Sequence, residues 1–215
     1  MMLHSLIKLP GAVAIALLAG AMIFVSPATT AGTIAIDFDG VNTSGGTVSG
    51  APVMSYLAGF GVTFSTTYAI NPVIEPYPYW MTPVSGSNSF GPQGLATAFS
   101  YMLDFDTPLE SVSFTRPGSY PAWMSAWSAT AYSADNTVLA AVGQGMLWSA
   151  PAATFTLNGA GIDHVVFTDN ANSFAGTNFR LDNLTLTSKV PEPSTLSLLG
   201  IGLAGLGFGR RKKVA

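Results

Sequence analysis

The sequence predicts one all-β domain, a jelly-roll-like antiparallel β-sandwich, between two apolar terminal segments. Three observations support this fold class. Short runs in which apolar and polar residues alternate recur through residues 32–188, and this period of two is typical of strands with one buried face. Gly, Pro, Asn, Asp and Ser separate the runs. No segment of this region combines a helical period with capping residues, so we expect about nine strands and no helix.

The predicted strands follow one another at short intervals. The first begins at Thr33 and places Ile34, Ile36 and Phe38 on one face. The others cover residues 61–66, 99–105, 112–114, 126–132, 137–142, 153–157, 162–168 and 178–187. Residues 133–136 (Ser-Ala-Asp-Asn) predict a hairpin turn. Residues 70–94 contain five prolines and are expected to form a long loop, which in a compact domain is often functional.

The N-terminal residues 1–31 have the features of a secretory signal peptide. Lys8 precedes an uninterrupted apolar run from Gly11 to Val25, and small residues lead to Ala28 and Ala31. Cleavage is expected after one of these alanines, with Ala31 favoured, and export would use the Sec machinery. A retained membrane helix is the alternative, which the short run and the small residues disfavour.

Charge and cysteine content limit the functions open to the central domain. Residues 32–188 carry two arginines against ten acidic residues, a formal net charge of −8, whereas the whole chain has −3 because most basic residues lie outside this region. Such a domain repels phosphate backbones, so nucleic acid is not an expected partner. The chain has no cysteine, so its core must be held by packing rather than disulfides.

The C-terminal residues 189–215 combine three parts in a fixed order. A linker (189–194) precedes an uncharged apolar segment (195–209) and a basic end (210–215). Fifteen helical residues span about 22 Å, less than the ~30 Å of a bilayer core, so the segment predicts a marginal transmembrane helix. A basic cluster keeps its end on the cytoplasmic side. The defining residues are Pro191, Glu192 and Pro193, and then Arg210, Arg211, Lys212 and Lys213.

This order resembles the PEP-CTERM sorting signal of exported bacterial proteins. The resemblance implies processing near Pro191-Glu192-Pro193 by an exosortase-type enzyme after transient retention in the inner membrane. It also implies a Gram-negative host with an extracellular polysaccharide matrix, and a destination at the cell surface or in that matrix. An ordinary transmembrane anchor is the alternative.

The central domain carries a looser resemblance. Ile36-Asp37-Phe38-Asp39, residues 131–139, and residues 162–165 with 179–184 look like lectin-like or carbohydrate-binding-module-like β-sandwiches. The resemblance implies a glycan ligand and a structural calcium between the terminal strands.

Four residues are candidates for that calcium site. Asp37 and Asp39 share one strand face, and the apolar parity changes near Asp182 and Asn183, which indicates a bulge. If the first and last strands pair, these side chains approach one another, and Ca²⁺ prefers such oxygen ligands. The alternative is that Asp37 and Asp39 only solvate an exposed face or bond to turns.

Tyr79 and Trp80, in the proline-rich segment, are the candidate ligand-binding residues, because exposed rings can stack on the apolar faces of sugars. Alternatively they cover an end of the sandwich. Trp127 is expected in the core and His164 is expected to be structural. With no G-x-S-x-G or H-E-x-x-H motif, catalysis is not expected. We therefore expect a non-catalytic, glycan-binding surface protein. The alternatives are a purely structural or adhesive protein and, more weakly, a hydrolase.

Overall fold

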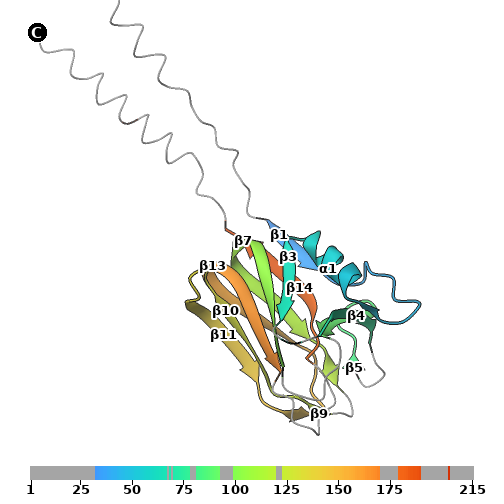
Figure 1. The fold of residues 1–215 in the computed structure, drawn as a ribbon. Coiled ribbons are helices and arrows are strands. Elements are labelled where there is room, and N and C mark those ends of the chain that lie inside the picture. The colour runs from blue at the N-terminus through green and yellow to red at the C-terminus, as the bar shows by residue number, and fades with distance from the viewer. Residues whose placement is uncertain are drawn as a thin grey trace, which may run out of the picture. The chain divides into compact units, whose positions relative to one another are not determined.

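The computed structural model describes residues 32–66, 68, 70–77, 81–92, 99–119, 123–169, 179–189 and 203. The chain divides into two compact units, and every described residue except Leu203 lies in the unit Ala31–Val190, here called the body. Apart from one short helix, the regular elements of the described body are strands, and all their pairings are antiparallel (Figure 1). The prediction of an all-β domain is therefore confirmed.

Seven strands form the main sheet, in the order β1-β14-β7-β13-β10-β11, with β3 also paired to β7. The first and last strands pair as the sequence predicted, with Thr33 opposite Thr187. β10 and β11 form the predicted hairpin around residues 133–136, in which the Ser133 N–H donates to the Thr137 carbonyl oxygen at 3.0 Å. The strands are β1 (Thr33–Ile36), β3 (Val62–Thr66), β7 (Phe99–Arg116), β10 (Trp127–Tyr132), β11 (Val138–Gln144), β13 (Ala153–Asp169) and β14 (Asp182–Ser188).

Two long strands, β7 and β13, pair with each other and run through both halves of the main sheet. Their register shifts between Asn158 and His164, which marks an irregularity in the middle of the pair. β3 pairs with the first part of β7 and β14 with the last part. Phe114, in the last part, contacts Phe167 and Trp127 with ring centroids 5.1 and 5.6 Å apart. Because these rings come from opposite ends of the long pair, the two halves of the sheet face one another across the core.

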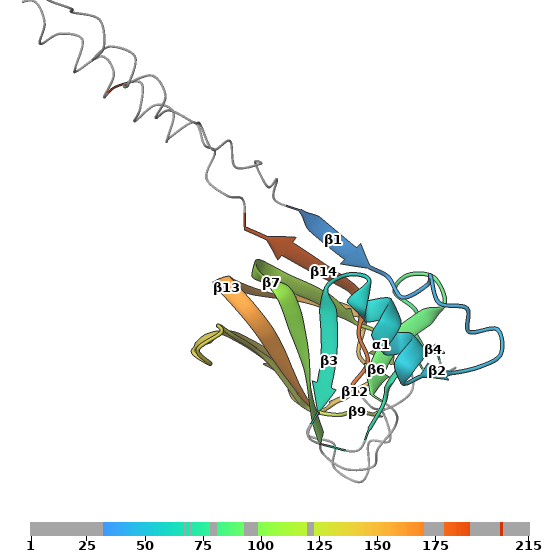
Figure 2. The same ribbon diagram turned by 45° about the horizontal axis from the view of Figure 1, so that its top comes forward.

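Three smaller sheets complete the body (Figures 1 and 2). The prediction that residues 70–94 form one long loop was wrong, since β4, β5 and β6 all lie within it and β4 pairs with β6. Their prolines stand at strand ends or edges, where a missing N–H is tolerated. The strands are β2 (Val48–Ser49), β4 (Pro72–Pro76) and β6 (Asn88–Pro92) in one sheet, β5 (Met81–Thr82) with β8 (Gly118–Ser119), and β9 (Trp123–Met124) with β12 (Leu147–Trp148).

The prediction of no helix was also wrong. Helix α1 (Ala51–Ala58) has a proline in its first turn and buries Val53 and Leu57, which are four residues apart and share one face. It lies beside β3 and β4 (Figure 2). Gly50 caps it without any side-chain hydrogen bond, and no acidic residue stands in its first turn. Apart from this proline, the usual start signals are therefore missing, and eight residues are too few for a clear period.

The core is aromatic and continuous between the two halves of the main sheet and the small β2-β4-β6 sheet. Trp127 is 2% exposed, as expected for a core residue. Stacked and edge-to-face pairs link the rings through the whole core, which includes Phe38, Phe64, Phe90, Phe99, Tyr101, Phe114, Phe167 and Phe179. Packing of this kind is how a body without cysteine can be held together.

Among the residues that the structure describes, no helix is long and apolar enough to cross a membrane. The expected signal helix and, apart from Leu203, the expected transmembrane helix at 195–209 lie outside the described residues.

Candidate functional site

Asp182, one of the predicted calcium ligands, is fully buried and accepts four hydrogen bonds. Its Oδ2 accepts the Tyr77 hydroxyl at 2.7 Å, the Ser85 hydroxyl at 2.9 Å and the Ser85 N–H at 3.2 Å. Its Oδ1 accepts the N–H of Asn183 at 2.7 Å. Ser85 Oγ also lies 3.0 Å from Asn183 Oδ1. The carboxylate thus fastens the segment 84–88 to the start of β14.

Asp39 holds the other end of the same segment. Its Oδ1 accepts the N–H groups of Ser87 at 2.8 Å and Asn88 at 3.1 Å. Gly86 directly precedes these two residues with φ of 43°, and a Cβ on it would stand 1.7 Å from Asp39 Oδ2. Only glycine fits both the backbone conformation and the space. Asp37 takes a local role, since its Oδ1 accepts the N–H of Asp39 at 3.1 Å.

The structure therefore brings Asp39, Asp182 and Asn183 to one short segment, 84–88, which sequence reasoning did not single out. The parity change predicted near Asp182 is present as a register shift between Asp182 and Thr185, with Asn183 at φ of 48°. Within the described ranges, no group of three or more His, Asp or Glu side chains is placed to hold a metal ion. The calcium site stays a prediction.

Burial shapes the electrostatics of this region. Burial raises the pKa of Tyr77, and its hydrogen bond to Asp182 adds to the increase. Burial also raises the pKa of Asp182, against the hydrogen bonds from Tyr77, Ser85 and Asn183 that lower it. The charge on Asp182 is thus held in place by donors and not by a cationic side chain.

His164 is placed as a structural residue. It is 8% exposed, its ring stacks on Tyr132 with centroids 5.1 Å apart, and its Nδ1 lies 3.1 Å from Asp163 Oδ2. Ile162, two residues earlier on β13, joins the core, and the register of β13 with β7 shifts between Ile162 and His164.

A pocket of about 300 Å³ opens on the main sheet. Most of its lining residues alternate with core residues along β3, β7 and β13, so they belong to the face turned away from the core. Met102 and Val166 supply apolar surface, and hydroxyls surround it: Ser65 Oγ donates to Asp104 at 3.0 Å, and Ser100 Oγ lies 3.0 Å from Thr168 Oγ1. The pocket is lined by Ser65, Thr66, Ser100, Tyr101, Met102 and Val166.

Two buried arginines stabilise the body. Arg180 pairs with Glu75 of β4 at 2.5 Å. Arg116 donates to Gln144 Oε1 at 2.6 Å and to the Ser125 carbonyl at 3.2 Å, and its guanidinium lies 5.9 Å from the Trp127 ring centroid. Burial lowers the pKa of Arg116 to about 10, so it remains charged at neutral pH. Glu75 is engaged in the ion pair with Arg180.

Tyr79 and Trp80, the predicted ligand-binding residues, lie outside the described residues. The structure adds an exposed apolar run that the sequence did not predict: Met146, Leu147 and Trp148 are 44%, 39% and 51% exposed. The sequence signal was three consecutive large apolar residues between glycine and serine, too short to show which way they point.

Comparison with known proteins identifies the C-terminal segment. Residues 189–213 match the PEP-CTERM protein-sorting motif. The chain thus carries the sorting signal of an exported, surface-directed protein, whose processing is by an exosortase-type enzyme. No curated protein sequence matches the chain.

Among solved structures, the body is similar to adhesin and carbohydrate-binding β-sandwich domains. The K2 cleaved adhesin domain of Lys-gingipain matches with 12% identity and a TM-score of 0.46, over 72% of this chain and 99% of that one. The CBM22-1 xylan-binding domain of Paenibacillus barcinonensis Xyn10C has 10% identity and a TM-score of 0.35, over 76% and 97%. The GH31 CBM32-2 domain bound to GalNAc has 11% and 0.32, over 60% and 97%. Likenesses this weak say nothing about a ligand.

Proposed function

We propose that this protein is a non-catalytic component of the bacterial surface or extracellular matrix whose body binds glycan. In this proposal residues 1–31 are a signal peptide, 32–188 a jelly-roll-like β-sandwich, and 189–215 the sorting segment with a transmembrane helix at 195–209. The inner membrane would hold the chain only until it is processed. The sorting motif at 189–213 is the observation that carries the proposal.

The surface chemistry of the body supports glycan as the ligand. A sugar ring offers an apolar C–H face and an edge of hydroxyls, so it needs apolar surface beside hydrogen-bonding groups. The pocket beside Asp104 combines Met102 and Val166 with a rim of hydroxyls. Outside this pocket, Trp148 on β12 is 51% exposed and could also contact a sugar ring.

The test is binding of the full-length chain, purified in detergent, to a panel of soluble bacterial and plant polysaccharides by affinity electrophoresis. Retardation by at least one polysaccharide, relieved by its oligosaccharides, is expected. A purely structural or adhesive protein would migrate unchanged on every gel. Hydrolysis of a polysaccharide that disappears in His164→Ala would favour the hydrolase instead.

The calcium prediction is tested by scanning calorimetry in calcium and in EDTA. If Asp37, Asp39, Asp182 and Asn183 bind Ca²⁺, the melting temperature should rise with calcium, by an increment that grows with concentration above the Kd. Asp39→Asn should reduce that increment, whereas Asp135→Asn in the exposed β10–β11 turn should leave it unchanged. An identical melting temperature in both solutions would remove the site.

A further inference from the structure

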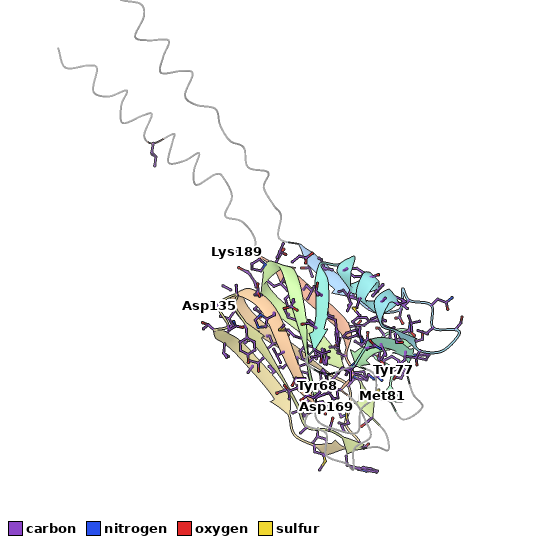
Figure 3. The ribbon with its side chains drawn as sticks, in the orientation of Figure 1. Tyr68, Tyr77, Met81, Asp135, Asp169 and Lys189 are labelled. Carbon is purple, nitrogen blue, oxygen red and sulfur yellow. The ribbon has the colours of Figure 1, made fainter. Side chains whose placement is uncertain are left out.

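One end of the body carries no charged residue in the segments that build it. The described residues of this distal end are 117–119, 123–126 and 144–152, which include β8, β9 and β12, and none of them is Asp, Glu, Lys or Arg. β9 and β12 lie at the end opposite the one where β14 leads to Lys189 (Figures 1, 2 and 3). The sorting segment follows Lys189, so attachment through it acts at the other end of the body.

The distal end exposes a continuous apolar run. Met146, Leu147 and Trp148 are consecutive and all at least 39% exposed, which is unusual for large apolar side chains in a soluble body. β12 is fixed by pairing with β9, where Leu147 stands opposite Met124 and Trp148 opposite Trp123. The run is therefore displayed on a paired strand and not on a free loop.

The charges nearest this surface are withdrawn into the core. Arg116 is 3% exposed and bonds to Gln144 and Ser125, and Asp169 is 1% exposed. The second arginine of the body, Arg180, is 5% exposed and pairs with Glu75. By contrast, exposed Asp135 and Lys189 lie toward the opposite end (Figure 3). An anionic polymer finds no arginine available at the distal end, and the acidic body repels it at longer range.

We propose that the distal end, centred on Trp148, binds a neutral glycan chain. This inference rests on the proposed glycan-binding function and adds the ligand class and the place. The indole face of Trp148 stacks on the C–H face of an uncharged sugar, and the absence of charge in these segments leaves no cost of desolvating an ion.

The experiment compares full-length variants, in detergent, against neutral polysaccharides (dextran, xyloglucan and galactomannan) and anionic ones (alginate and polygalacturonate). Wild-type protein should bind at least one neutral polymer and neither anionic one. Trp148→Ala should weaken that binding about tenfold, and Trp148→Phe should restore most of it. Val138→Ala removes an apolar side chain that is 57% exposed at the start of β11, and it should bind like wild type. Melting temperatures verify that each variant is folded.

Each other outcome overturns the inference in a different way. Unchanged binding in Trp148→Ala with loss in Met102→Ala would place the glycan in the sheet pocket, and the proposed function would survive. Preference for alginate or polygalacturonate would contradict the neutral class. Binding to phosphatidylethanolamine–phosphatidylglycerol vesicles through Trp148, with none to neutral polymers, would assign the surface to lipid. No binding to any polysaccharide would reject the proposed function as well.

Discussion

At the scale of single residues, Asp182 is a carboxylate in a buried position, where its oxygens need hydrogen-bond donors. It is fully buried, and three of its four hydrogen bonds come from Tyr77 and Ser85, which lie about a hundred residues earlier in the chain. A buried carboxylate without an adjacent cation is tolerated only when its oxygens are supplied with donors. Asp182 therefore binds β14 to the segment 84–88 through polar contacts, next to a core held by aromatic packing.

Asp182→Asn should lower the free energy of unfolding by about 1–3 kcal/mol at pH 7. The amide nitrogen replaces one carboxylate oxygen and cannot accept the hydrogen bonds that this oxygen accepts in wild type. The gap to wild type should widen in acid. Burial raises the pKa of Asp182 in the folded state, so protonation of Asp182 stabilises the folded wild type. This added stability is fully present below the pKa of Asp in the unfolded chain, about 3.9, and is lost as pH rises through the raised pKa of the folded state.

The measurement is the melting temperature of wild type, Asp182→Asn and the exposed-site control Asp106→Asn between pH 7 and pH 4. The control should follow wild type in parallel. A gap between wild type and Asp182→Asn that narrows in acid would mean that the hydrogen bonds outweigh burial and that the pKa is lowered.

At the scale of elements, the segment 84–88 is held at both ends by carboxylates. Gly86→Ala should destabilise the body by about 2–4 kcal/mol, because the new Cβ requires Asp39 to move and the backbone has φ of 43°. Gly45→Ala is the matched control, since a Cβ there would meet nothing within 4 Å. Chemical denaturation should show a large change for the first variant and less than about 0.5 kcal/mol for the second. Equal midpoints for both variants would contradict the contact between Gly86 and Asp39.

The elements also separate what sequence could predict from what it could not. The pairing of β1 with β14, the hairpin at 133–136 and the irregularity at Asn183 were all predicted, because alternation and its interruption are local signals. The number of strands was not, because β7 and β13 continue through residues such as Thr107 and Gly159, where alternation fails and the register between the two strands shifts. The two-residue strands of β5, β8, β9 and β12 are too short for any period.

The candidate sites divide in the same way. The sequence placed Asp39, Asp182 and Asn183 near one another, but not Ser85 and Gly86, whose role depends on a contact between segments about fifty to a hundred residues apart. Trp148 could not be distinguished from the core residue Trp127 by its neighbours alone. Exposure is set by which face of which sheet is covered, and this is a property of the assembled fold.

At the scale of the whole molecule, the sorting segment follows one end of the body, and the exposed run 146–148 lies at the other end. The motif at 189–213 follows β14 directly, and Lys189 is the last described residue before it. Among the residues that the structure describes, the core lies between Ile36 and Leu186. Removal of the segment after residue 189 would therefore leave in place every core contact among these residues.

Processing is the prediction that belongs to this scale. In native cells, the mature protein should lack Arg210 to Ala215, because the basic end is retained on the cytoplasmic side while the body is released. Replacing Pro191-Glu192-Pro193 with three alanines should leave the basic end attached and keep the protein in the inner-membrane fraction, because the extended stretch that prolines impose would be lost. Asp135→Asn, in the exposed turn of the body and outside the sorting motif, should be processed like wild type. Intact-mass spectrometry of each fraction measures both outcomes. If wild-type protein from native cells still carried Arg210 to Ala215 and remained in the inner membrane, the segment would be a permanent anchor, and the distal end of the body would then meet its ligand at that membrane instead of in the matrix.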